Sequence, residues 1–270
     1  MVPRALRPFT EKTGAFFMEK LWAENNIVIK IGSSSLTNNG AEINHALMED
    51  LARQISIVKD MGYGVSVVTS GAIACGKLEM GNGNTEEVHK QVLAAVGQRP
   101  LLNAWGQAFD KYNIKTGLFL FAESDLDKPS LPLRNALSHG IVPIINANDT
   151  VSVDEIRQLA ISADNDRLAS YVAKNLVFAS KLILLTESSG VWDVNRQVID
   201  SIDSETDLLR IGLFNKTSVG TGGIESKIIE ARRFIDQLGK QAYIAGAGDT
   251  DVIIKIMKGD SIGTKVTLPL

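Results

Sequence analysis

The sequence contains a single cysteine, Cys75, among 270 residues. One cysteine cannot form an internal disulfide, and it also excludes a metal site built from several cysteines. The three histidines, His45, His89 and His139, show no metal-site spacing with each other or with carboxylates, so we expect surface or structural roles for them. Cysteine clusters and histidine ligands are therefore not expected to carry the chemistry of this protein.

Long apolar segments are also missing. No apolar run reaches 18 residues, and residues 1–25 lack the apolar core and cleavage pattern of a signal peptide. A net charge of −3 gives no general attraction to nucleic acid or to anionic membranes, so neither is expected as a partner. With 44% hydrophobic residues the chain can form a substantial core, and we expect a soluble, cytoplasmic protein.

One short segment combines a buried strand with a charge. Residues 27–31 are apolar and β-branched except for Lys30, and the small residues 32–35 follow directly. A lysine within an apolar strand costs several kcal/mol unless its ammonium group reaches an anion or water. Backbone N–H groups of a small-residue loop can hold phosphate next to such a lysine. A lysine that reaches solvent from an edge strand is the alternative, and this segment alone leaves both open.

Strand, loop and helix alternate along the chain, which predicts a mainly parallel sheet in an α/β fold. No linker divides the chain, so we expect an amphipathic N-terminal extension at residues 1–25 and one domain at 26–270, with a lobe or flap over a site at 191–213. Expected strands are 27–31, 65–68, 115–122, 141–145, 181–186, 241–245 and 263–268; expected helices are 46–61, 88–109 (interrupted at Gly97 and Pro100), 133–138, 167–178, 224–238 and 252–257.

A second loop could also hold phosphate. Residues 220–227 are rich in glycine, lead into a helix and carry Lys227 one turn later. The spacing fits neither a Walker P-loop nor a dinucleotide-binding fingerprint. A flexible loop followed by an ordinary helical lysine explains this segment as well.

Short polar side chains follow three of the expected strands. They are Asn146, Asn148 and Asp149, then Asp164 to Asp166, and finally Glu187. Taken one at a time, helix caps and turns explain them equally well. Because strand ends of a parallel sheet meet at one edge, together they could bind a substrate ammonium, orient lysines or coordinate magnesium.

Several of these segments, in this order, resemble the glutamate 5-kinases of the amino acid kinase family. The matching segments are 28–34, 69–74, 94–98, 145–151, 164–166 and 220–223, within a resemblance that spans about residues 26–268. The resemblance implies a three-layer αβα sandwich and transfer of the γ-phosphoryl group of ATP to the side-chain carboxylate of L-glutamate, the first step towards proline. It implies ATP and Mg²⁺, the metal being held mainly by ATP phosphates and not by protein ligands.

The resemblance also implies roles for individual residues. Lys30, Lys227 and Asp166 would be catalytic, with Asp166 orienting the lysines, and Ser70, Gly71, Asp149 and Asn165 would bind glutamate. The nucleotide would contact Lys30, Gly32, Ser33, Thr186, Glu187, Thr221, Gly222, Gly223, Ile224 and Lys227. Expected partners are L-glutamate, glutamyl phosphate reductase and further copies of the chain.

The sequence departs from the family pattern near the expected acceptor site. Ala147 stands where the family usually has glutamate, Ser162 and Ala163 stand where Phe-Gly is common, and Glu187 replaces an aspartate. The spacing from Asp149 to Asp164 is a few residues longer than usual, and the sequence stops before the PUA domain of many bacterial members. Two alternatives therefore stay open: a family member acting on a related carboxylate or phosphate acceptor, and a non-catalytic nucleotide or amino-acid sensor.

Overall fold

The computed structural model describes residues 25–81, 87–126, 131–151, 165–211, 223–235 and 240–268. Residues 1–24 of the predicted N-terminal extension, the segment 152–164 and residues 220–222 of the second glycine-rich loop lie outside these residues. In the described part of the chain no helix is long and apolar enough to cross a membrane.

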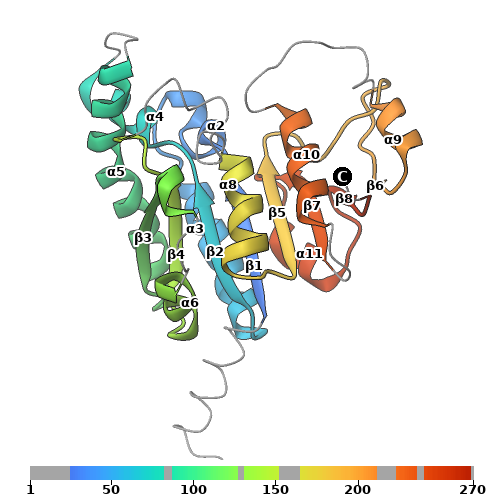
Figure 1. Ribbon diagram of the computed structural model, residues 1–270, viewed down its shortest axis with the longest axis horizontal. Coiled ribbons are helices and arrows are strands. Elements are labelled where there is room, and N and C mark those ends of the chain that lie inside the picture. The colour runs from blue at the N-terminus through green and yellow to red at the C-terminus, as the bar shows by residue number, and fades with distance from the viewer. Residues whose placement is uncertain are drawn as a thin grey trace, which may run out of the picture.

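The described residues form one sheet of eight strands in the order β3-β4-β2-β1-β5-β7-β8-β6 (Figure 1). Every neighbouring pair is parallel except β7 and β8, which confirms the predicted mainly parallel sheet. The strands are β1 (Asn26–Ile31), β2 (Gly64–Thr69), β3 (Thr116–Phe121), β4 (Val142–Ala147), β5 (Lys181–Thr186), β6 (Ser201–Ile202), β7 (Gln241–Gly246) and β8 (Thr264–Val266).

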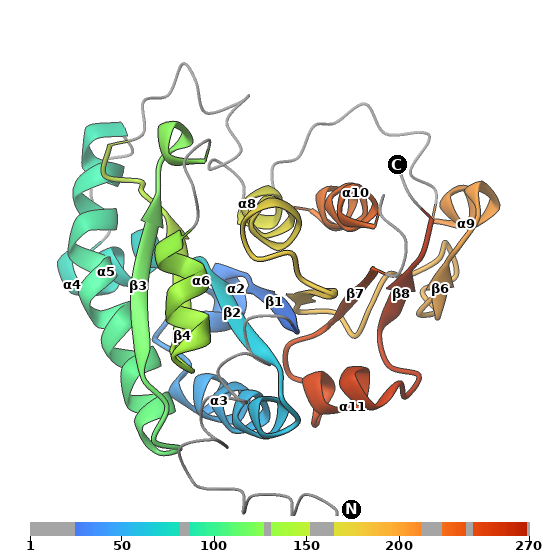
Figure 2. The same ribbon diagram turned by 60° about the horizontal axis from the view of Figure 1, so that its bottom comes forward.

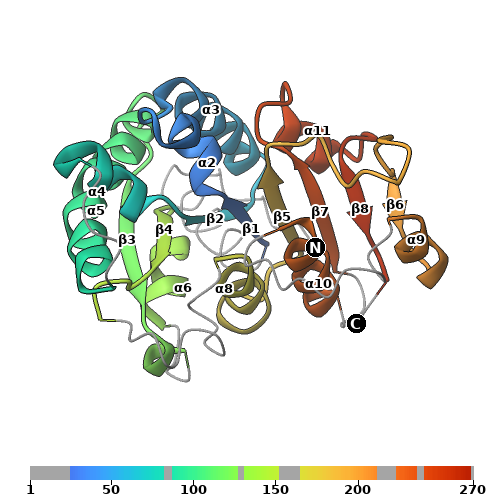
Figure 3. The same ribbon diagram turned by 90° about the horizontal axis from the view of Figure 1, so that it is seen from above.

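Helices cover both faces of the sheet, which gives the expected three-layer αβα arrangement (Figure 3). One face carries α3 (His45–Asp60), α4 (Ala72–Met80), α5 (Glu87–Asp110) and α11 (Val252–Lys258); the other carries α6 (Leu131–Ser138), α8 (Asn165–Tyr171) and α10 (Ile224–Phe234). In Figure 2, α8 and α10 lie side by side over the middle of the sheet. Shorter elements are α2 (Ser33–Leu36), η1 (Asn38–Gly40), η2 (Glu123–Asp125), the π-helical turn η4 (Val172–Leu176) and α9 (Glu205–Arg210).

Strand β1 lies at the centre of the sheet. It pairs along its length with β2 on one side and with β5 on the other, and all six of its residues are buried. The idea that Lys30 reaches solvent from an edge strand is therefore wrong. β-Branched side chains suit this position because both faces of the strand pack against helices.

The structure corrects the prediction for residues 88–109. Helix α5 runs from Glu87 to Asp110 through both Gly97 and Pro100 without the expected interruption. A Cβ atom at position 97 would overlap the carbonyl oxygen of Ala72 and the backbone nitrogen of Gly76 in α4. Glycine at 97 therefore permits close packing of two helices and does not end a helix.

The segment 191–211 is the described part of the predicted lobe or flap. It contains a bridge between Trp192 and Val198, the short strand β6 and helix α9, and β6 forms the outer edge of the sheet beyond β8. Arg232 of α10 pairs with Glu205 of α9 at 3.0 Å, which ties this segment to the domain. Its described residues extend the edge of the sheet, and a role as a flap over a ligand site stays a prediction.

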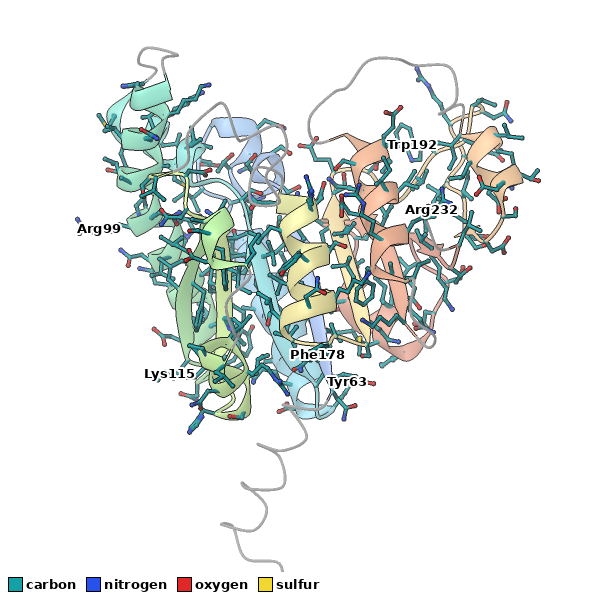
Figure 4. The ribbon with its side chains drawn as sticks, viewed as in Figure 1. Tyr63, Arg99, Lys115, Phe178, Trp192 and Arg232 are labelled. Carbon is teal, nitrogen blue, oxygen red and sulfur yellow. The ribbon has the colours of Figure 1, made fainter. Side chains whose placement is uncertain are left out.

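The orientation of the strands fixes where a ligand can bind. Tyr63, Lys115 and Phe178, labelled in Figure 4, precede β2, β3 and β5 and lie at the lower end of the sheet in that view. The carboxyl ends of these strands, followed by the predicted site residues, therefore lie at the upper end. Ligands of open α/β sheets bind at that edge.

Replacing Gly97 with alanine tests the packing of α4 on α5. We expect Gly97→Ala to lower the free energy of unfolding by about 1–3 kcal/mol or more, because the added methyl group meets backbone atoms that cannot rotate away. The matched control is Gly106→Ala in the same helix, where an added Cβ meets no described atom within 4 Å. There the higher helix propensity of alanine should raise stability by up to about 1 kcal/mol. Urea unfolding measures the free energy of unfolding of both variants. Equal changes in the two variants would contradict the close approach of α4 and α5 at Gly97.

Candidate active site

The side of β1 on which Lys30 lies is set by strand alternation. Ile27, Ile29 and Ile31 pack in the core under α3, α4, α5 and α11, whereas Val28 packs in the core under α6, α8 and α10. Successive side chains of a strand point to opposite faces, so Lys30 shares the face of Val28. The lysine is only 6% exposed, and its charge requires a partner on that face.

The partner is Asp166, the second residue of α8. Its Oδ1 lies 2.7 Å from the ammonium nitrogen of Lys30, and its Oδ2 lies 2.8 Å from that of Lys227 in α10. Asp166 is fully buried and each lysine is 6% exposed. The structure thus brings together the three residues predicted to be catalytic, and it places both ammonium groups against one carboxylate.

The described residues of this cluster are not balanced in charge. Among them, two ammonium groups face one carboxylate, an excess of one formal positive charge where little water can screen it. The turn after β1 borders the cluster, since a Cβ atom at Gly32 would lie 4.0 Å from the ammonium nitrogen of Lys30. A cationic cluster next to a small-residue turn suits an oxygen-rich anion such as phosphate.

A cleft with a volume of about 890 Å³ lies beside the cluster. Its walls come from α2, η1, α4 and the turn after β4, and they include Ser33, Ser70, Gly71, Asp149 and Asn165. Four of these are the predicted glutamate-binding residues. The structure therefore places the predicted acceptor residues around one cavity.

Asn165 carries the central contact of this cleft. Its side-chain Nδ2 donates a hydrogen bond of 2.8 Å to the hydroxyl oxygen of Ser70. Its Oδ1 is buried and has no hydrogen-bond partner among the described residues. A buried acceptor without a partner costs free energy that a ligand donor would recover, and an ammonium group is such a donor.

Two consecutive residues of α8 connect the cleft to the lysines. Asn165 lines the cleft, and Asp166 holds Lys30 and Lys227. Asp166 also lies at the start of its helix, where a carboxylate interacts favourably with the helix dipole. An acceptor bound in the cleft can thus meet a phosphate held by the lysines at the start of α8.

Gly71 shapes the entrance to α4. It adopts φ 106° and ψ 0°, a left-handed conformation that glycine accepts without strain, and α4 starts at the next residue. An added Cβ would lie 3.7 Å from the methyl group of Thr37. The turn thereby presents the first backbone N–H groups of α4 to the cleft, where they can bind oxygen atoms.

The predicted nucleotide residues lie at neighbouring strand and helix ends. Thr186 ends β5, which pairs with β1, and the exposed Glu187 follows it. Gly223 precedes α10 in an extended conformation, and Ile224 is the first residue of that helix. Thr221 and Gly222 lie outside the described residues. Contact with a nucleotide stays a prediction for this whole group.

Two further residues have no individual role in the resemblance, although Asn146 belongs to the group of polar residues that follow the expected strands. Asn146, at the end of β4, is 1% exposed, and its Nδ2 has no hydrogen-bond partner in the described part of the chain. Its place at the end of an apolar strand is the signal that includes it in that group. Lys77 of α4 lines the cleft, but an exposed helical lysine gives no such signal.

The model of the amino acid kinase family matches residues 25–246. The chain belongs to the amino acid kinase family. All three residues of the buried cluster and the residues around the cleft lie within the matched range. The matched range therefore includes strands β1 to β7 and the site at the carboxyl ends of the strands.

Curated relatives in the family are similar over most of the chain. A glutamate 5-kinase from Dehalococcoides mccartyi is 37% identical over 256 residues, covering 88% of this chain and 67% of that protein. Glutamate 5-kinase 1 from Bacillus licheniformis is 38% identical over 260 residues, covering 90% and 69%. Among solved structures, the carbamate kinase of Giardia has a TM-score of 0.66 at 16% identity, covering 91% of this chain and 99% of that one, which supports the fold.

Removing the carboxylate of Asp166 tests the balance of charges in the cluster. We expect Asp166→Ala to lower the free energy of unfolding by about 3–5 kcal/mol, because two buried ammonium groups lose their shared counter-charge. The exposed Asp260 offers a control, and Asp260→Ala should change stability by less than about 0.5 kcal/mol. Chemical unfolding measures both. A loss below about 1 kcal/mol for Asp166→Ala would contradict a desolvated cluster.

Proposed function

We propose that the protein transfers the γ-phosphoryl group of ATP to the side-chain carboxylate of L-glutamate, giving glutamyl 5-phosphate. The observation that carries this proposal is the buried Asp166 between Lys30 and Lys227, directly next to the cleft that Asn165 and Ser70 line. Relatives named glutamate 5-kinase, at 37% and 38% identity, support the choice of acceptor.

The acceptor needs no general base. A carboxylate with a reference pKa of about 4.3 is ionised at neutral pH, so its oxygen can attack phosphorus directly. This oxygen forms a bond to the γ-phosphorus, and the bond from that phosphorus to the oxygen bridging the β- and γ-phosphates breaks. The electron pair leaves with ADP. A site without histidine suits this reaction.

The protein supplies charge and position. In this proposal Lys30 and Lys227 bind the oxygens of the transferring group, and Asp166 holds both ammonium groups in place before the substrates arrive. Preorganised charges of this kind stabilise the transition state without a cost of reorganisation. Ser70, Gly71, Asp149 and Asn165 would hold the amino acid so that its carboxylate faces the phosphate.

The proposed phosphoryl donor is ATP, together with Mg²⁺. A related structure is described as the carbamate kinase of Giardia lamblia bound to AMP-PNP, which supports ATP as the donor. Among the described residues no three His, Cys, Asp or Glu side chains converge on a metal position. We propose that Mg²⁺ enters with the phosphates of ATP, and we derive no step from it.

The proposal also includes a partner enzyme, an oligomeric state and a cellular location. The product is an acyl phosphate, a reactive group that a following reaction should consume quickly, which supports glutamyl phosphate reductase as the functional partner. We also propose a homo-oligomer and a cytoplasmic location, where a single unpaired cysteine stays reduced.

Removing either lysine tests the proposal. We expect Lys30→Ala and Lys227→Ala each to reduce kcat by ~100-fold or more, because each removes a preorganised charge from the transferring group. The assay traps the acyl phosphate with hydroxylamine and measures glutamate-dependent hydroxamate. Circular dichroism of each variant separates loss of activity from loss of fold.

Two comparisons make this test specific. Lys258→Ala removes an exposed lysine from α11 and should leave kcat unchanged. Parallel assays with aspartate, N-acetylglutamate, carbamate and UMP should give little turnover. Wild-type activity in a folded Lys30 or Lys227 variant, or faster turnover of another acceptor, would contradict the proposal.

A further inference from the structure

The cleft extends beyond the residues assigned to glutamate. Besides Ser70 and Asn165 it includes one face of α4, to which Ile73 and Lys77 contribute, and Gly81 directly after the helix. Ile73 and Lys77 are four residues apart, and such residues lie on the same face of a helix. The outer half of the cleft is therefore a wall of α4 that the reaction at the lysine cluster does not use.

The described lining of the cleft contains one side chain of each charge. Among the described residues that line it, Lys77 is the only cationic side chain and Asp149 the only anionic one. Lys30 and Lys227 are not part of this lining. An α-amino acid bound here carries one ammonium and one α-carboxylate besides its side chain, so it matches one anionic and one cationic wall residue.

The direction of α4 determines where Lys77 lies relative to Ser70. The helix starts at Ala72, next to Gly71 and Ser70, and Lys77 lies five residues further, about 7–8 Å along the axis. Helical side chains lean towards the N-terminus of their helix, and lysine has a flexible four-carbon stem. Its ammonium group can thus reach back over a ligand that is bound at Ser70.

We propose that Lys77 binds the α-carboxylate of the acceptor and so selects an amino acid with a free α-carboxylate. This inference rests on the proposed function and adds a specificity residue to it. With its α-carboxylate at Lys77 and its ammonium group near Asp149 and Asn165, the acceptor extends its side-chain carboxylate towards Lys30 and Lys227. The cleft would then select acceptors whose two carboxylates are separated by the same distance as in glutamate.

The test compares L-glutamate with L-glutamic acid 1-amide, which keeps the side-chain carboxylate and the ammonium group but has a neutral α-amide. In the wild type, kcat/KM should favour glutamate. In Lys77→Met this preference should fall by ~10-fold or more through a higher KM for glutamate, because the hydrogen bond between two charged groups is lost. kcat for glutamate should stay close to wild type, since Lys77 does not touch the transferring phosphate.

Two control variants and one control substrate complete the design. Lys77→Arg keeps the charge and should restore most of the preference, and Lys258→Met, the same change on exposed α11, should not alter it. Glutarate, which has both carboxylates but no ammonium group, should still be sensitive to Lys77→Met. An unchanged preference in Lys77→Met would overturn the inference.

The outcome separates this inference from the proposed function. If the wild type turns over glutamate and Lys77→Met keeps its preference, the role of Lys77 is wrong and the kinase proposal stands. If no glutamate-dependent hydroxamate forms at all, the kinase proposal fails. Calorimetric binding of glutamate and its 1-amide to both proteins then decides the role of Lys77, and equal affinity losses for the two ligands would overturn it.

Discussion

The buried ion cluster of Lys30, Asp166 and Lys227 is the interaction on which the rest of the site depends. Each of the two lysines would be costly to bury alone, and the shared carboxylate makes both positions tolerable. The three charged groups are held in place by three different elements, β1, α8 and α10. Such a cluster is expensive to build for stability alone, whereas a fixed cationic point suits the transfer of a negatively charged group.

The fold supports this cluster from both faces of the sheet. β1 is paired on both sides, so the backbone of Lys30 is rigid, and α8 and α10 pack together where Ser170 donates a hydrogen bond of 3.1 Å to the carbonyl oxygen of Glu230. On the other face, the close approach of α4 and α5 at Gly97 holds the wall of the cleft. Chemistry at one edge therefore relies on packing that extends through the domain.

Some of this follows from the sequence and some does not. The apolar pattern predicts β1, because strand formation here depends on local geometry. The face on which Lys30 lies follows only from the packing of its neighbours, since both faces of this strand are buried. The contact with Asp166 joins residues far apart in the chain, and only the resemblance to a family indicates it. At Gly97 a local rule for helix interruption fails because close packing against α4 decides. Lys77 has no local signal, since only the fold brings its helix to the cleft.

A structure of the protein with ADP, aluminium fluoride and L-glutamate tests the central claim most directly. The aluminium fluoride group mimics the transferring phosphoryl group. We predict that the ammonium nitrogens of Lys30 and Lys227 both lie about 2.7–3.1 Å from its fluorides and keep their contacts with Asp166. An aluminium fluoride group bound away from both lysines, with the cluster intact, would contradict the account.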